Sequence, residues 1–253
     1  MSVPGNVEGK VGVETYSEFA LGHLQGLVKQ NHAVMEKIKA TLIEDVRAGR
    51  SLFVTGSGHS GLFSLELYHR AGGASFIVPI VADYLLPTAG PSVVRMLERT
   101  PGTSSVLLDR FNPLPGEMIW ICSQSGINAS VVDMAIASKA RGLKTVAFTS
   151  VAHSSAVKSR HSSGQRLFEV CDQVVDMGGR AGDALVPVSA ETYAGPVSTL
   201  SSVLLAHSIV VAACAELEAS GVRCVYTSVN TPEGEARNKE LEKKAAVRDY
   251  RLL

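Results

Sequence analysis

Two glycine- and serine-rich segments in this chain each follow a short apolar run and precede a stretch with helical periodicity. The first, Gly56-Ser57-Gly58-His59-Ser60-Gly61, follows residues 51–55, and the second, Ser123-Gln124-Ser125-Gly126, follows residues 118–122. The N-terminus of a helix leaves backbone N–H groups without partners and favours a negative charge, and serine hydroxyls add further donors. The two segments therefore predict an anion site suited to a phosphate group.

An alternation of apolar runs with helical stretches must position these two loops. We expect strands at residues 51–55, 75–81, 118–122, 144–149, 170–175 and 223–227. We expect helices at 14–48, from the first loop to about residue 70, from the second loop to 141, and at 165–170, 196–219 and 232–247. The alternation is typical of an α/β fold, here a three-layer αβα sandwich with a mostly parallel sheet of about five strands and an N-terminal helical extension. Ligands of such sheets bind beyond the carboxyl ends of the strands, where both loops lie.

The amino-acid composition indicates how many domains the chain has and which classes of partner it can bind. Residues 1–13 are polar and glycine-rich, so we expect a flexible tail there and a single domain over 14–253. The 24 Lys and Arg residues balance 24 Asp and Glu residues, which leaves no excess of positive charge for nucleic acid. The longest apolar stretch, 203–217, is shorter than the roughly 20 residues that span a bilayer, so we expect a buried helix and no membrane partner. Four cysteines without a CxxC pair favour a reducing cytoplasm.

The second loop resembles the phosphate-binding signature of the sugar isomerase (SIS) domain, Ser-x-Ser-Gly-x-Thr/Ser. It reads Ser123-Gln124-Ser125-Gly126-Ile127-Asn128 in this chain. The first loop is similar to the first Gly/Ser loop of the same family, and the resemblance covers most of residues 14–220. It looks closest to the phosphoheptose isomerase-like branch, which implies an isomerase that acts on a sugar phosphate.

The resemblance also implies roles for the loop residues. The phosphate would be held by Ser123, Gln124, Ser125, Gly126 and Asn128, and the sugar by Gly56, Ser57, Gly58, His59 and Ser60. Asn128 stands where the family usually has a hydroxyl, but an amide can still donate to phosphate oxygens. The competing interpretation of the second loop is a polar helix cap, which needs one hydroxyl.

Aldose–ketose isomerisation moves a proton between adjacent carbons through an enediol, so it needs a base and an acid near those carbons. Our candidates are Glu66, about one and a half turns into the helix after the first loop, and His207, in an apolar helix. The segment 207–216 looks similar to the late helix that carries the catalytic histidine of phosphoheptose isomerases, whereas Glu66 is chosen on chemistry alone. The alternatives are a surface carboxylate for Glu66 and a core or interface histidine for His207, with Glu191 as another base.

Three other functions stay open. Gly56-x-Gly58-x-x-Gly61 with Asp83 matches a dinucleotide fingerprint and would indicate NAD, although it leaves the second loop without a role. SIS domains also serve as phosphosugar sensors in transcription regulators, but residues 1–50 contain no basic recognition helix. A phosphosugar lyase or etherase would use the same phosphate site and a glutamate base.

Further expectations concern metals, mobility and assembly. No His, Cys, Asp or Glu set has metal-ligand spacing, so we expect no metal and no cofactor, with zinc held by histidines from distant segments as the alternative.

The donor-rich segment 159–164 is expected either to close over the ligand or to form a capped surface turn. The resemblance implies a site completed by a neighbouring subunit, so we expect a homodimer or homotetramer with contacts through residues 14–48 and 196–219.

Overall fold

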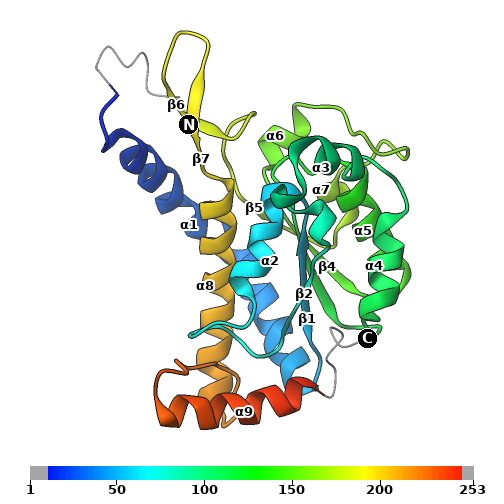
Figure 1. Ribbon diagram of the computed structural model, residues 1–253, viewed down its shortest axis with the longest axis vertical. Coiled ribbons are helices and arrows are strands. Elements are labelled where there is room, and N and C mark those ends of the chain that lie inside the picture. The colour runs from blue at the N-terminus through cyan, green and yellow to red at the C-terminus, as the bar shows by residue number, and fades with distance from the viewer. Residues whose placement is uncertain (1–10, 247–253) are drawn as a thin grey trace.

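The computed structural model describes residues 11–246, and a five-stranded parallel sheet forms their centre (Figure 1). The strands are β1 (Leu52–Gly56), β2 (Ile77–Ile80), β3 (Met118–Cys122), β4 (Lys144–Thr149) and β5 (Gln173–Asp176), in the order β2-β1-β3-β4-β5. Every neighbouring pair in this sheet is parallel, which confirms the predicted α/β fold. Most of the predicted tail at 1–13 and the end of the predicted helix 232–247 lie outside the described residues.

Helices cover both faces of the sheet. They are α1 (Thr15–Arg47), α2 (Gly61–Leu67), α3 (Pro91–Leu97), α4 (Thr103–Phe111), α5 (Ala129–Ala140), α6 (Val151–Ser155), α7 (Leu167–Val170), α8 (Ser198–Ala219) and α9 (Pro232–Ala246). Successive strand side chains point to opposite faces, so Val54 joins a core with α1, α2 and α8, and Phe53 joins a second core with α4, α5 and α7. These two cores are the interfaces of the predicted three-layer sandwich.

Helix α8 is the most apolar long helix in the described part of the chain. By length and composition it could cross a membrane, with a mean hydropathy of 1.8, but half of that window is buried inside the domain. It packs along α1, and Leu205, Ile209 and Leu217 belong to the core that covers the sheet (Figure 1). These contacts are those of a core helix, as the sequence predicts for 203–217.

The predicted strand at 223–227 is wrong. This segment makes one isolated bridge, Ala74 to Val225, and does not extend the sheet. The backbone N–H groups of Cys224 and Val225 instead donate to the carboxylate of Glu218, which Arg237 of α9 also contacts. The segment also exchanges backbone hydrogen bonds with residues 72–75, which lie outside the sheet, so it stays a short irregular pairing and adds no strand.

A two-stranded antiparallel hairpin was not predicted. It consists of β6 (Ala184–Pro187) and β7 (Tyr193–Pro196) and stands beside the N-terminal end of α1 (Figure 1). The Tyr16 hydroxyl donates to the carbonyl oxygen of Pro196 at 2.6 Å, and the Arg180 guanidinium lies over the Tyr193 ring. The hydroxyl of Tyr16 therefore attaches the hairpin to α1, and Arg180 attaches it to the chain that precedes β6.

Candidate functional site

The two Gly/Ser loops leave the sheet at the same level. Gly56 at the end of β1 is paired with Cys122 at the end of β3, so the loops that follow lie side by side. Between them and the neighbouring segments lies a cleft of about 930 Å³. Its lining comes from five parts of the chain. These are the first loop (Ser57, Gly58, His59, Ser60), the second loop (Ser123, Gln124, Ser125, Ile127, Asn128), α3 with its flanks (Pro87 in the turn before it, Pro91, Val94, Arg95, Glu98, Arg99), the segment with His153, Val157, Lys158 and Arg160, and finally Gly182, Asp183 and Ser198.

The second loop turns tightly against β4. Gly126 has φ +61°, and a Cβ at this position would lie 2.9 Å from Oγ1 of Thr149. Its N–H donates to Oγ of Ser123 at 3.1 Å, which leaves the Ser123 hydroxyl hydrogen free to donate elsewhere. Gly126 therefore lets the loop turn tightly against β4 on the side away from the cleft, while Ser123 and Ser125 line the cleft.

Gln124 ties the second loop to the chain that follows β5. Its side-chain amide donates to the carbonyl oxygen of Gly178 at 3.3 Å, and its backbone carbonyl oxygen accepts from the N–H of Ser150. The hydroxyl of Ser125 takes part in no hydrogen bond to residues 11–246 and is available to a ligand. The loop is thus fixed by its backbone and by Gln124, with a free hydroxyl on the cleft side.

Asn128 precedes the first residue of α5 but does not cap the helix with its side chain. Its Oδ1 accepts from Nη1 of Arg160 at 3.0 Å. The N–H of Ser130 in the first turn of α5 donates to the backbone carbonyl oxygen of Glu98, and no side chain of Asn128 caps the turn. The other N–H groups of this turn favour an anion at the helix N-terminus. The alternative of a serine- or asparagine-capped helix does not describe this end of α5.

The first loop contacts the second through hydroxyl groups. Ser57 accepts a hydrogen bond from Ser130 of α5, with 3.4 Å between the two Oγ atoms. Gly58 has φ +60° and begins the short 3-10 turn Gly58–Ser60 that leads into α2. Gly56 does not line the cleft; a Cβ there would collide with the carbonyl oxygen of Ser60. Of the five predicted sugar-binding residues, the structure places Ser57 to Ser60 on the cleft.

Charge in the cleft favours an anion. Its cationic side chains are Arg95, Arg99, Lys158 and Arg160, and its carboxylates are Glu98 and Asp183. Asp183 accepts from the N–H and the hydroxyl of Ser198, so it caps α8. The α3 side chains were not predicted from the sequence, although arginines four positions apart share one face of a helix and could have indicated a basic patch.

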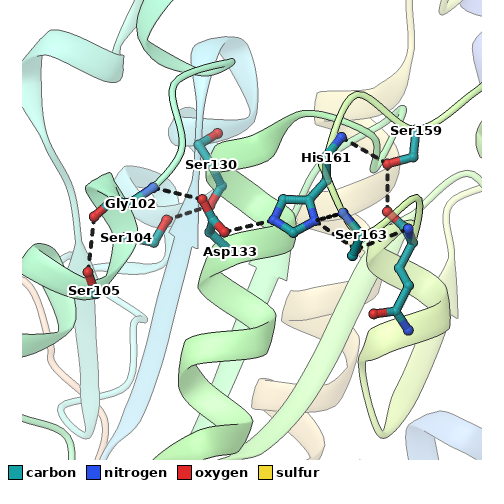
Figure 2. A network of polar contacts seen from close by, with 9 residues as sticks. Gly102, Ser104, Ser105, Ser130, Asp133, Ser159, His161 and Ser163 are labelled. Carbon is teal, nitrogen blue, oxygen red and sulfur yellow. Dashed lines mark hydrogen bonds and ion pairs between the residues drawn. The ribbon is translucent and has the colours of Figure 1, made fainter.

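A polar network holds the segment that carries Lys158 and Arg160 (Figure 2). Nε2 of His161 lies 2.8 Å from Oδ1 of Asp133 in α5, and Nδ1 lies 2.7 Å from Oγ of Ser163. The other carboxylate oxygen of Asp133 accepts from the N–H of Gly102, which precedes α4. The predicted capped turn at 159–164 is therefore present, and Arg160 within it reaches the cleft.

The structure brings Glu66 and His207 together but not into the cleft. Nε2 of His207 lies 3.6 Å from Oε1 of Glu66, where α2 packs against α8, and Arg70 pairs with the same carboxylate. Burial, with Arg70 nearby, lowers the pKa of His207, which favours the neutral imidazole. Neither residue is part of the cleft lining.

The remaining candidates lie apart from the cleft lining. Glu191 is exposed in the turn between β6 and β7, and Asp83 is exposed at the start of a 3-10 turn after β2. Among residues 11–246, no three His, Cys, Asp or Glu side chains come together as metal ligands. The four cysteines are free thiols, and the cytoplasmic location stays a prediction.

Comparisons with known proteins agree with this geometry. The SIS domain family model matches residues 15–150. The UPF0309 protein of Shouchella clausii is 35% identical over 232 residues, which cover 90% of this chain and 94% of the relative. The UPF0309 protein of Oceanobacillus iheyensis is 36% identical over 202 residues, covering 79% and 82%.

Solved structures share the fold at low sequence identity. The phosphoheptose isomerase of Neisseria gonorrhoeae has a TM-score of 0.54 and 13% identity, covering 80% of this chain and 97% of that protein. The phosphoheptose isomerase of Francisella tularensis has a TM-score of 0.51 and 10% identity, covering 79% and 95%. The NanR protein of Vibrio vulnificus, solved in complex with ManNAc-6P, has a TM-score of 0.50 and 13% identity, covering 92% and 68%.

Proposed function

The chain belongs to the SIS domain family, and from that premise we propose that its cleft binds a sugar phosphate and interconverts the aldose and ketose forms through an enediol. The observation that carries this proposal is the second loop, which presents Ser123, Gln124 and Ser125 to the cleft just before α5, a helix whose N-terminus has no capping side chain from the described part of the chain. Hydroxyl, amide and helix N-terminal donors at one place suit the three terminal oxygens of a phosphate monoester.

The charges of the cleft support a phosphate dianion. Four cationic side chains against two carboxylates give the lining a net positive charge. The guanidinium of Arg160 reaches the second loop through Asn128, so it adds a cation beside the helix N-terminus. In this proposal Asn128 orients Arg160 through its Oδ1, and its amide group, which also contacts Glu98, offers one hydrogen to the ligand in the place of the usual hydroxyl.

The sugar would extend from the phosphate toward the first loop. Ser57 and Ser60 offer hydroxyls there, His59 an imidazole, and Gly58 a surface without a side chain. These groups can donate to and accept from sugar hydroxyls. The volume of the cleft, about 930 Å³, accommodates a sugar phosphate of six or seven carbons.

We propose that Glu66 and His207 exchange protons with a substrate held by a second copy of the chain. The pair lies on a face of α2 and α8 where Leu62, Leu65, Leu200 and Val211 are exposed, with accessibilities between 39% and 59%. Leu200, His207 and Val211 recur at helical spacing, so they share one side of α8. An apolar face around an ionisable pair suits the interface of a homodimer or homotetramer.

A binding panel tests the proposed function. Thermal unfolding is followed with fructose 6-phosphate, sedoheptulose 7-phosphate, glucosamine 6-phosphate and NADH in separate wells. A ligand at a hundred times its Kd stabilises the folded state by about 2.7 kcal/mol. We expect a sugar phosphate to raise the unfolding temperature, whereas stabilisation by NADH alone would contradict the proposal. Binding without turnover would point to a phosphosugar sensor, and release of a substituent to a lyase or etherase.

A further inference from the structure

Glu98 is a carboxylate placed inside the cleft, between the two loops. It follows the last residue of α3, and its backbone is fixed on both sides: its N–H donates to Val94, and its carbonyl oxygen accepts from the N–H of Ser130 in α5 at 3.0 Å. On the first loop, Gly58 is so close that an added Cβ would lie 3.7 Å from Oε2 of Glu98. On the second loop, the side-chain amide of Asn128 interacts with the carboxylate.

The position of Glu98 is that of a group facing the sugar. The phosphate of the proposed substrate lies at the second loop, and the sugar extends toward Ser57 to Ser60. Glu98 lies against Gly58, in the middle of this path, while Asp183 is occupied by its hydrogen bonds to Ser198. Among the residues that line the cleft, Glu98 is thus the carboxylate that no serine hydroxyl or backbone N–H of the described residues engages; it contacts the Asn128 amide and is left to exchange a proton with a ligand.

The surroundings of Glu98 suit both protonation states. Burial raises the pKa of this carboxyl, and the charges of Arg99, Arg160 and Arg95 together with the Asn128 amide counteract the rise in part. A carboxyl whose pKa is shifted toward neutrality can accept a proton and return it in one turnover. His59, His153, Lys158 and Asp183 are the other ionisable side chains that line the cleft.

We infer that Glu98 is the catalytic residue that transfers the carbon-bound proton of the substrate, in the isomerisation proposed above on which this inference rests. Its carboxylate removes the proton from the carbon beside the carbonyl, and the C–H electron pair becomes the C=C bond of the enediol while the carbonyl oxygen gains a proton. Glu98 then returns its proton to the former carbonyl carbon as the neighbouring hydroxyl loses its own. In this scheme Glu66 and His207 transfer the other two protons, to the carbonyl oxygen and from the neighbouring hydroxyl.

Deuterium incorporation in D2O tests whether Glu98 transfers the carbon-bound proton. A proton held by Glu98 exchanges with solvent, so the sugar phosphate gains deuterium on carbon at C1 or C2. NMR follows this incorporation for fructose 6-phosphate and sedoheptulose 7-phosphate with the wild-type chain, the variants Glu98→Gln and Glu98→Asp, and Glu44→Gln as a surface control. Calorimetric titration of the same sugar phosphates into each variant gives Kd, and thermal unfolding checks that each is folded.

We expect Glu98→Gln to lose incorporation by about 100-fold or more, the size typical of a general acid–base residue. Its Kd for the sugar phosphate should stay equal or fall, because one negative charge leaves an anion site. Glu98→Asp should recover part of the rate, and the surface control Glu44→Gln should retain the wild-type rate of incorporation. Unchanged incorporation in Glu98→Gln overturns the inference, as does a wild-type protein that binds a sugar phosphate without incorporation. Failure of both sugar phosphates to bind the wild-type protein refutes the proposed function for them and the inference with it.

Discussion

Nε2 of His207 lies 3.6 Å from Oε1 of Glu66, so α2 and α8 bring together two residues that the sequence separates widely. The contact is made where the two helices pack and not at the cleft. The same face of α8 carries the exposed side chain of Val211. His207 is thus half-buried between two helices and lies beside the apolar face that we propose as the contact with a second copy of the chain.

The first prediction concerns pH. The pKa of His207 is lowered by burial and by Arg70, so below its ordinary value of 6.5 the unfolded chain binds a proton that the folded chain does not. The contribution of His207 to the free energy of unfolding therefore falls as the pH drops below 6.5. Urea denaturation at pH 5 to 8 should show a steeper acid loss for the wild-type protein than for His207→Gln, with His32→Gln as an exposed control. Parallel curves for wild type and His207→Gln would contradict this account.

The second prediction concerns assembly. Val211→Glu places a charge on the exposed apolar face of α8, where the side chain has 59% accessibility. Burying an unpaired carboxylate costs several kcal/mol, so the assembly should dissociate toward the 26.7 kDa monomer. Light scattering after size exclusion measures the mass. Leu114→Glu, at a position with 49% accessibility away from α2 and α8, should leave the mass unchanged. A wild-type monomer would remove the proposed second copy.

The third prediction concerns the phosphate loop. Ser125→Ala removes a hydroxyl that makes no hydrogen bond to the described part of the protein, so the unfolding free energy should change by less than about 0.5 kcal/mol. Losing one hydrogen bond to a charged phosphate costs about 1.5–3 kcal/mol, which corresponds to roughly 10- to 100-fold in Kd. Calorimetry with fructose 6-phosphate and sedoheptulose 7-phosphate measures the loss. Ser105→Ala on α4, which contacts Gly102, is the matched control. Equal Kd values for both variants would remove Ser125 from the phosphate site.

The fourth prediction compares two glycines. Gly126→Ala meets φ +61° and a Cβ position 2.9 Å from Thr149, so it should lower the free energy of unfolding by at least about 1–2 kcal/mol. Gly26→Ala lies in α1 with open space around it and should raise the free energy by about 1 kcal/mol through helix propensity. Urea denaturation measures both changes. A neutral Gly126→Ala would mean that the second loop is not as tightly held as its contacts indicate.

The central strands could be predicted to the residue where the chain is buried on both faces. Met118–Cys122 and Lys144–Thr149 are continuous apolar or β-branched runs, and the structure gives the same bounds. The segment 223–227 was harder to predict, because it has β-branched and aromatic residues typical of a strand but bonds to the Glu218 side chain of α8 and to the loop 72–75 outside the sheet. Composition does not distinguish these two ways of satisfying backbone N–H groups.

The residues of the cleft could be predicted only in part, because some of them are placed by contacts between segments far apart in the sequence. Ser57 to Ser60 and Ser123 to Ser125 follow strand ends, so their place at one edge of the sheet depends on strand order alone. Arg95 and Glu98 reach the cleft because the end of α3 is hydrogen-bonded to Ser130, a contact between segments far apart in sequence. Local patterns do not contain such contacts.

The chain of bonds from Gly102 through Asp133 to His161 fixes the segment that carries Lys158 and Arg160 before any anion arrives. Preorganised cations lose little conformational entropy on association, so more of the electrostatic attraction is retained as affinity. The same rigidity favours anions of one shape, because the guanidinium and hydroxyl groups do not rearrange to bind an anion of a different size.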